Sequence, residues 1–442
     1  MRSMYLIALC LLVLATSASH AQSPRTFDVP EPCRDVKQDV DSLERRKQRL
    51  EQEIAAKQAA LSAATESNRK ALGEEVRRDQ EVLVGLVFEL ECAAIKRRVQ
   101  ETPVTPRRAA RPAVPKAIEI TTYYATNRKR SGVQDPAKFY DLTDSGTVEY
   151  GRAIVSMPLS HTPGDLELPS LWKLERRPDP NKHFVLKAVN PLRVDAALQE
   201  ISQTLQVSPG KAVLLFVHGY NTTFQDAAMR TAQLAYDLKF PGVPLFFSWP
   251  SAGRPTSYLR DTDTAELSER HFAQLLDHLS RLPTTDVYVI AHSMGNRIVT
   301  TGVRARVEKG QDTSKVRELL LAAPDINADL FRTQIAPALA RMRGTRTTVY
   351  ASSKDLALRA SSVLHEYSRV GDTHPNVFVH PRIETIDASG VSLLNRGYGH
   401  TYIMDSQAVL NDIHLLLQRR VSAKDRGLSA VGKAPALYWK FR

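Results

Sequence analysis

The sequence predicts an α/β fold, with a mostly parallel sheet covered by helices on both faces, preceded by an N-terminal antiparallel helical hairpin. Short apolar runs typical of buried strands alternate with helical stretches from residue 213 to residue 417, which predicts the sheet. Before residue 100, apolar residues instead follow a heptad-like pattern, which is typical of paired helices. The chain has 442 residues, which is long enough for more than one structural unit. Because 43% of its residues are hydrophobic, it can bury a substantial core.

The elements of the sheet are predicted from these runs. Short β-type runs come first, at 118–124, 152–157 and 183–189. The strands of the alternating region are expected at 213–217, 244–249, 287–291, 318–323, 347–351 and 376–380. Helices are expected between them, at 224–238, 265–282, 294–308, 330–342 and 407–417.

The N-terminal residues have the three regions of a secretory signal peptide, which we expect to span residues 1–21. The apolar run at 5–15 is shorter than the roughly 20 residues that a membrane-spanning helix needs. No transmembrane span is expected in the mature chain. The sequence thus predicts a protein exported to the periplasm or secreted.

Residues 22–101 are expected to form the hairpin, with its tip at 62–68. Without the signal peptide, Cys33 and Cys92 remain as a pair in an oxidising compartment. Their midpoint falls at the proposed tip, so a disulfide between them would clamp the open end of the hairpin. The alternative is one unbroken helix in an oligomeric coiled coil, which would keep the two cysteines apart.

After the hairpin, residues 102–116 are rich in Pro, Ala and Arg and are predicted to be an exposed linker. The main domain is expected at 117–420, followed by a loosely ordered basic tail at 421–442. The net charge of +12 suggests an anionic envelope surface as a partner for the hairpin and linker, whereas nucleic acid is not expected as a partner outside the cytoplasm. The simpler account of each basic cluster is a solvated face.

A strand, a sharp turn and a helix are predicted around Ser293, between 287–291 and 296–303. This arrangement fits a nucleophile elbow, which requires small residues two positions before and after the serine, here Ala291 and Gly295. An ordinary strand-to-helix cap would have the same local pattern. A second feature supports the elbow.

An earlier apolar strand ends in His218-Gly219, a sequence that shapes a loop donating a backbone N–H to a developing oxyanion. The expected donors are the N–H groups of Tyr220 and Met294.

These motifs resemble those of a bacterial α/β-hydrolase family of unknown function, often described as esterase/lipase-superfamily proteins. The similar segments lie at 124–128, 216–221, 247–251, 291–296, 323–326 and 399–400, within a region that extends from 118 to 417. The resemblance implies the α/β-hydrolase fold and the nucleophile, but identifies no substrate.

In this fold the acid follows the nucleophile along the chain and the histidine comes last. Asp355 follows a predicted strand and is the expected acid, with Asp325 as its rival one strand earlier. Either carboxylate could instead cap a helix. His400 lies in a glycine-containing loop before the last helix and is the expected base.

The loop after the strand at 244–249 supplies Trp249, Arg254 and Tyr258 as candidates for substrate contact, although Trp249 and Tyr258 could equally be packing residues. No cofactor and no metal are expected. The sequence predicts an exported serine hydrolase acting on a small-molecule or lipid ester, with amide hydrolysis and acyl transfer as variants. The alternative is a catalytically silent protein that binds or scaffolds at the cell envelope.

Overall fold

The computed structural model describes residues 39–63, scattered positions between 68 and 89, and then 117–169, 175, 177–253, 257–283, 286–365, 367–391 and 400–441. The chain divides into two compact units, one containing the N-terminal helix and the other containing the sheet. The expected signal peptide, the linker and both cysteines of the expected disulfide lie outside the described residues. Among the described helices, none combines the length and the apolar character needed to cross a bilayer.

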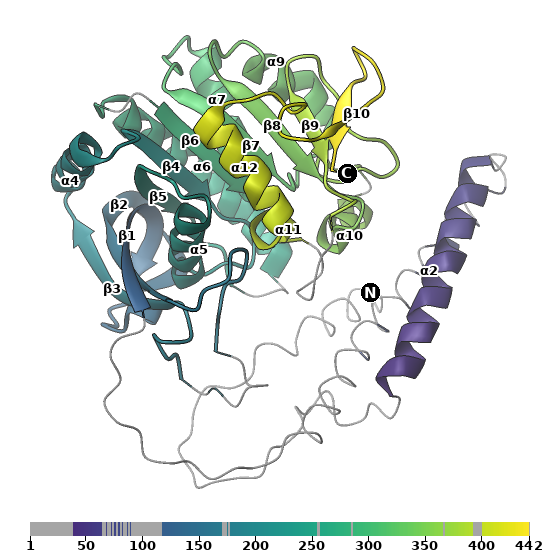
Figure 1. The fold of residues 1–442 in the computed structure, drawn as a ribbon, viewed down its shortest axis with the longest axis horizontal. Helices are drawn as coiled ribbons and strands as arrows, with labels where there is room; N and C mark the ends of the chain where they lie inside the picture. The colour runs from purple at the N-terminus through teal and green to yellow at the C-terminus, as the bar shows by residue number, and fades with distance from the viewer. Residues whose placement is uncertain are drawn as a thin grey trace, which may run out of the picture. The chain divides into compact units, whose positions relative to one another are not determined.

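The N-terminal unit contains α2 (Val40–Ala63) and helical positions between 68 and 89 (Figure 1). Leu43, near the start of α2, packs with Leu86, and both side chains are buried. Lys57, near the end of the helix, forms an ion pair of 2.7 Å with Asp79. Leu43 precedes Lys57 along the chain, whereas Leu86, the partner of Leu43, follows Asp79, the partner of Lys57. These contacts run in the antiparallel direction of the predicted hairpin.

The second unit contains an eleven-stranded sheet with the order β10-β11-β9-β8-β7-β6-β4-β5-β1-β2-β3 among the described residues. Its strands are β1 (Ala117–Arg130), β2 (Tyr140–Pro158), β3 (Val185–Leu192), β4 (Ala212–Val217), β5 (Val243–Ser248), β6 (Asp286–His292), β7 (Val316–Ala322), β8 (Arg346–Ala351), β9 (Glu384–Asp387), β10 (Ser429–Val431) and β11 (Tyr438–Lys440). Neighbouring strands are parallel along the stretch β11-β9-β8-β7-β6-β4-β5-β1 of this order. The pairs β1–β2, β2–β3 and β10–β11 are antiparallel.

Helices cover both faces of this sheet because its strands are apolar on both sides. In β4, Val213, Leu215 and Val217 join the core on one face, and Leu214 and Phe216 join the core on the other. The helices of the first face are α4 (Val194–Val207), α6 (Tyr258–Ser280), α7 (Gly295–Glu308) and α9 (Ala336–Leu339); those of the second are α5 (Phe224–Asp237), α11 (Tyr402–Asp405) and α12 (Gln407–Arg419). Figure 1 shows α5 and α12 lying over one face of the sheet. The predicted fold class is confirmed.

The strand predicted at 376–380 is wrong, because the strand after β8 is β9 (Glu384–Asp387). Pro375 and Pro381 flank the predicted segment, and proline has no N–H to donate to a strand ladder. Phe378 is buried as a packing residue, with its ring 5.0 Å from that of Phe331.

The helix predicted at 330–342 is also divided. It consists of α8 (Ala328–Leu330), a π-helical turn (Phe331–Ile335) and α9, with Pro337 in the first turn of α9.

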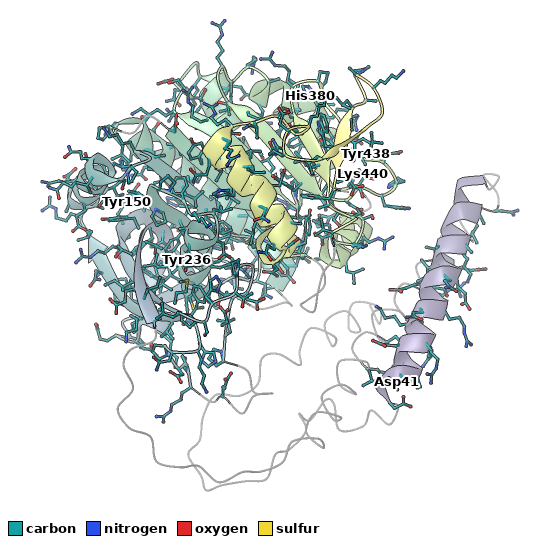
Figure 2. All side chains as sticks on the ribbon, in the orientation of Figure 1. Asp41, Tyr150, Tyr236, His380, Tyr438 and Lys440 are labelled. Carbon is teal, nitrogen blue, oxygen red and sulfur yellow. The ribbon has the colours of Figure 1, made fainter. Side chains whose placement is uncertain are left out.

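The prediction of a loosely ordered tail at 421–442 is wrong as well. In this segment β11 pairs with β9 and extends the sheet, and β10 pairs with β11. Figure 2 shows Tyr438 and Lys440 of β11 on the same side of the domain as His380.

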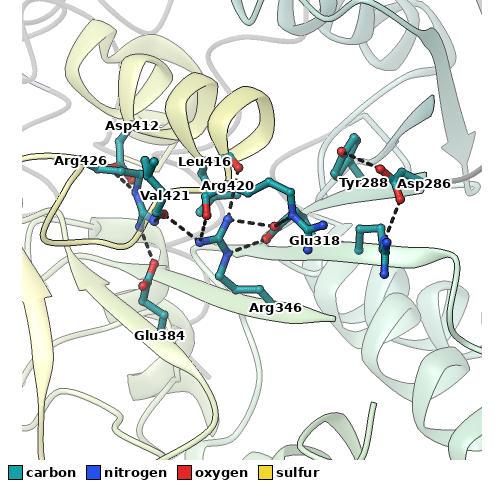
Figure 3. Close-up of polar contacts among 11 residues, drawn as sticks. Asp286, Tyr288, Glu318, Arg346, Glu384, Asp412, Leu416, Arg420, Val421 and Arg426 are labelled. Atoms are coloured by element: carbon teal, nitrogen blue, oxygen red, sulfur yellow. Dashed lines mark hydrogen bonds and ion pairs between the residues drawn. The ribbon is translucent and has the colours of Figure 1, made fainter. Parts of the chain in front are cut away.

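Basic side chains fix this C-terminal segment to buried carboxylates (Figure 3). Arg346 forms two bonds of 2.9 Å with the fully buried Glu318 and donates to the carbonyl oxygen of Val421. Arg426 donates to Asp412 at 2.8 Å and also pairs with Glu384. Arg426, a basic residue of the segment predicted to be loosely ordered, therefore has specific partners within the domain.

Candidate active site

Ser293 lies in a strained turn between β6 and α7. Its φ is +53°, in the left-handed region that costs a non-glycine residue about 1–2 kcal/mol. The Ser293 N–H donates to the carbonyl oxygen of Ala322 at 2.9 Å, and its own carbonyl oxygen accepts from the N–H and the side-chain amide of Asn296 at 3.1 and 2.9 Å. These bonds hold the strand, turn and helix in the arrangement that the sequence predicts for a nucleophile elbow.

Two glycines allow the end of β4 to lie directly against this turn. A Cβ added to Gly295 would lie 2.4 Å from the carbonyl oxygen of His218 and 2.8 Å from that of Val217. A Cβ added to Gly219 would lie 2.7 Å from the Cβ of Ser293. Gly295 and Gly219 therefore both allow the end of β4 to pack closely against the start of α7.

His400 and Asp355 are in direct contact. The Nδ1 of His400 is 2.7 and 2.9 Å from the two carboxylate oxygens of Asp355, which is fully buried between β8 and α10 (Leu356–His365). Asp355 also accepts a bond from the N–H of Leu358, so it caps α10 as well as holding the imidazole. Asp355 therefore caps a helix, as one interpretation of the sequence has it, and contacts His400, the partner that the other interpretation requires.

The second ring nitrogen of His400, Nε2, has a different environment from Nδ1. Nε2 is buried and has no hydrogen-bond partner within the described part of the chain, so the bond from the Ser293 hydroxyl is not formed in this structure. Burial opposes protonation of His400, but the charge and the hydrogen bond of Asp355 outweigh it and raise the pKa of the imidazole above 6.5.

His292 connects the His400 loop to the elbow. Its Nε2 donates to the carbonyl oxygen of His400 at 3.0 Å, and the two ring centroids are 4.7 Å apart. Burial and the neighbouring imidazole of His400 lower the pKa of His292 to about 3, so His292 stays neutral. No sequence motif assigns a role to His292, although its position directly before Ser293 places it at the elbow.

Asp325, the rival acid, lies in a different network. Its carboxylate accepts from Tyr258 at 2.5 Å and from Ser361 at 2.7 Å, and it forms ion pairs with Arg297 and Arg369 at 3.2 and 3.3 Å. Burial alone would raise the pKa of Asp325, but the two arginines lower it. The structure thus brings Asp355, and not Asp325, into contact with His400.

The three candidates for substrate contact differ in their environment. Trp249 is fully buried and stacks on the His218 ring at a centroid distance of 5.2 Å, so the packing interpretation describes it. Tyr258 is half-buried, with its ring 5.4 Å from that of Tyr220 in the loop after β4. Arg254 lies outside the described residues.

Met294 occupies the N-cap position of α7, beside backbone N–H groups that have no partner within the helix. Within the described ranges, no group of three or more His, Cys, Asp or Glu side chains lies close enough to hold a metal ion.

A family model described as "Alpha/beta hydrolase of unknown function (DUF900)" matches residues 193–419, just over half of the chain. The chain belongs to this family. The matched residues include the strands from β4 to β9, the elbow, Asp355 and His400, whereas β1 to β3 precede them. The resemblance stated from the sequence motifs is confirmed.

Among solved structures, the chain is similar to two structures of an esterase from Pyrobaculum calidifontis. One is 12% identical, covers 52% of this chain and 94% of that chain, and has a TM-score of 0.28. The other, also 12% identical, covers 70% of this chain and 84% of that chain with a TM-score of 0.29. A comparison with curated proteins gave no match. At this level of similarity, the activity of the archaeal esterase is not transferred to this chain.

The close packing at the elbow gives the first prediction. Gly295→Ala should lower the free energy of unfolding by about 1–3 kcal/mol, because the new methyl group meets two backbone carbonyls that cannot rotate away. Gly390→Ala is the matched control, since its Cβ would lie 3.7 Å from the nearest atom. Chemical denaturation of both variants measures the difference. Equal stability of the two variants would show that the elbow tolerates a side chain there.

Proposed function

We propose that this protein is a serine hydrolase that cleaves carboxylic esters through an acyl-enzyme on Ser293. The observation that carries the proposal is the Asp355–His400 contact, which His292 holds beside the elbow. Membership of an α/β-hydrolase family supports hydrolysis as the reaction class.

In the proposed reaction, the Ser293 oxygen attacks the ester carbonyl carbon while Nε2 of His400 takes the hydroxyl proton. Asp355 keeps the remaining ring proton on Nδ1 and stabilises the imidazolium that forms. The tetrahedral oxyanion accepts from the N–H groups of Tyr220 and Met294, each typically worth about 3–4 kcal/mol of transition-state stabilisation.

Collapse of the intermediate breaks the bond to the alcohol oxygen, which takes the proton from His400. Water then attacks the acyl-enzyme by the same route, with His400 again as base, and releases the acid and free Ser293. Amide hydrolysis and acyl transfer would use the same acyl-enzyme with a different leaving group or acceptor.

A fluorophosphonate probe tests the nucleophile. The parent protein should be labelled under native conditions, and Ser293→Ala should not, because only the activated hydroxyl attacks phosphorus. Ser156→Ala is the control, since Ser156 is a buried serine of β2. A parent that is labelled only after denaturation, or a Ser293→Ala variant labelled as fully as the parent, would contradict the proposal.

The pH dependence tests the acid. Because only neutral His400 can accept a proton and its pKa is raised, kcat/KM should fall as pH drops through a midpoint above 6.5. Asp355→Asn removes the charge that raises this pKa, so the midpoint should move to lower pH and the rate should fall about 10³- to 10⁴-fold.

Asp325→Asn is the comparison for this experiment. It should leave the midpoint almost unchanged, because Asp325 contributes least to the pKa of His400. Asp325→Asn should instead lower the free energy of unfolding, because Arg297 and Arg369 lose the carboxylate with which they pair. If Asp325→Asn shifts the midpoint and Asp355→Asn does not, the two carboxylates exchange roles.

We further propose that the protein is exported, with residues 1–21 removed and Cys33 joined to Cys92. Expression with the intact N-terminus should give a periplasmic or secreted protein whose first residue follows the signal peptide, as read by mass spectrometry. The non-reduced protein should contain one peptide pair linked through Cys33 and Cys92. Free thiols at both positions in the exported protein would contradict the disulfide.

A further inference from the structure

Arg128 of β1 is a buried cation held by neutral groups. Its side chain is 1% exposed and forms no ion pair with any described residue. It donates instead to the hydroxyl oxygen of Ser248 at 2.8 Å and to the carbonyl oxygens of Thr222, Ser251 and Asp141 at 2.7, 3.1 and 3.3 Å. The carboxylates of Asp261, Asp226 and Asp141 act on this charge from beyond ion-pair distance. Burying a charge is costly, so the direct bonds to neutral groups also replace part of its lost hydration.

The bond to Ser248 leads to the histidine of the His-Gly sequence. Ser248 accepts from Arg128, and its hydroxyl is 3.3 Å from Nε2 of His218. The Nδ1 of His218 is 2.8 Å from the carbonyl oxygen of Gly219. A carbonyl oxygen can only accept, so Nδ1 carries the ring proton and Nε2 accepts from Ser248.

The electrostatics agree with this neutral tautomer. Burial, together with the nearby charge of Arg128, lowers the pKa of His218 well below its ordinary value. Burial also lowers the pKa of Arg128, to about 9, so the guanidinium is still charged at neutral pH. The charge that starts the chain of bonds therefore keeps His218 neutral.

The last bond of this chain acts on a catalytic peptide group. The carbonyl of Gly219 and the N–H of Tyr220 belong to one planar trans peptide and point in opposite directions. A bond that fixes the carbonyl therefore fixes the N–H. Accepting a hydrogen bond also polarises the peptide and makes its N–H a stronger donor.

Trp249 holds the same turn from the other side. Its indole N–H donates to the carbonyl oxygen of His218 at 2.8 Å, and its ring is stacked on the imidazole. The peptide groups on both sides of Gly219 are thus fixed, directly beside the Cβ of Ser293.

We propose that Arg128, Ser248 and His218 are positioning residues that orient and polarise the Tyr220 N–H for the oxyanion. This inference rests on the proposed function. It assigns a role in the reaction to Arg128, which precedes the residues matched by the family model. The competing interpretation is a purely structural role, in which these residues only stabilise the contact of β1 with the ends of β4 and β5.

Ser248→Ala is the sharpest test, because it interrupts the chain and leaves Arg128 and His218 in place. Active sites are counted by fluorophosphonate titration, so that unfolded protein does not contribute. Per titrated site, kcat should fall about 10-fold with KM unchanged, a fraction of the loss seen when an oxyanion donor is removed. The affinity for a trifluoromethyl ketone, which forms a tetrahedral adduct, should fall by the same factor.

Two further readouts separate positioning from stability. The acid limb of the pH profile should not move, because His400 and Asp355 are untouched. Ser156→Ala, the matched buried serine, should keep the parental kcat and inhibitor affinity. A Ser248→Ala variant that loses only thermal stability, with kcat per site intact, would overturn the proposal.

Nitrogen NMR of His218 gives a readout that needs no turnover. The parent should show a neutral ring protonated on Nδ1, and Ser248→Ala should shift the Nε2 resonance. A ring protonated on Nε2, or a charged ring at neutral pH, would overturn the proposal while labelling of Ser293 still supported the proposed function. If the parent neither labels nor hydrolyses esters, the proposed function fails, and the role in oxyanion binding fails with it.

Discussion

The left-handed turn at Ser293 is the constraint on which the rest of this site depends. A serine with φ of +53° is stable only where its surroundings fix it, and here the Ala322 carbonyl, the Asn296 side chain and the end of β4 do so. The turn ends β6 and starts α7 within two residues. It thereby places the serine beside the loop after β4 and, through His292, beside the loop that carries His400.

Three histidines around this turn are distinguished by their partners. His400 contacts a carboxylate, and its pKa is raised. His292 and His218 donate to carbonyl oxygens and are kept neutral by burial and by neighbouring charged or ionisable groups. Only His400 therefore combines an unpartnered Nε2 with a carboxylate that stabilises its protonated form, as a general base requires. The other two fix backbone positions.

The strands and the elbow could be predicted because their signals are local. Continuous apolar runs identify buried strands, and small residues around Ser293 identify a tight turn. The strand predicted at 376–380 was wrong because burial there comes from core packing of Phe378 and not from a strand. The prolines on both sides have no N–H to donate to a neighbouring strand. The prediction for the basic C-terminal segment was wrong because Glu384, which pairs with Arg426, is distant in sequence.

The pairing of His400 with Asp355 followed from chain order, but the choice against Asp325 needed contacts that no local pattern encodes. The role inferred for Arg128 is similarly invisible in the sequence, since its partners come from three other segments. Such long-range polar contacts depend on tertiary structure, whereas apolar periodicity does not.

Trapping the acyl-enzyme tests the central account most directly. The protein is mixed with an activated acetyl ester, quenched in acid within a single turnover, and mapped by tandem mass spectrometry. The account predicts one acetyl group, on the peptide that contains Ser293 and on that residue. Turnover of the ester with no acetylated peptide, or with the acetyl group on another residue, would contradict it.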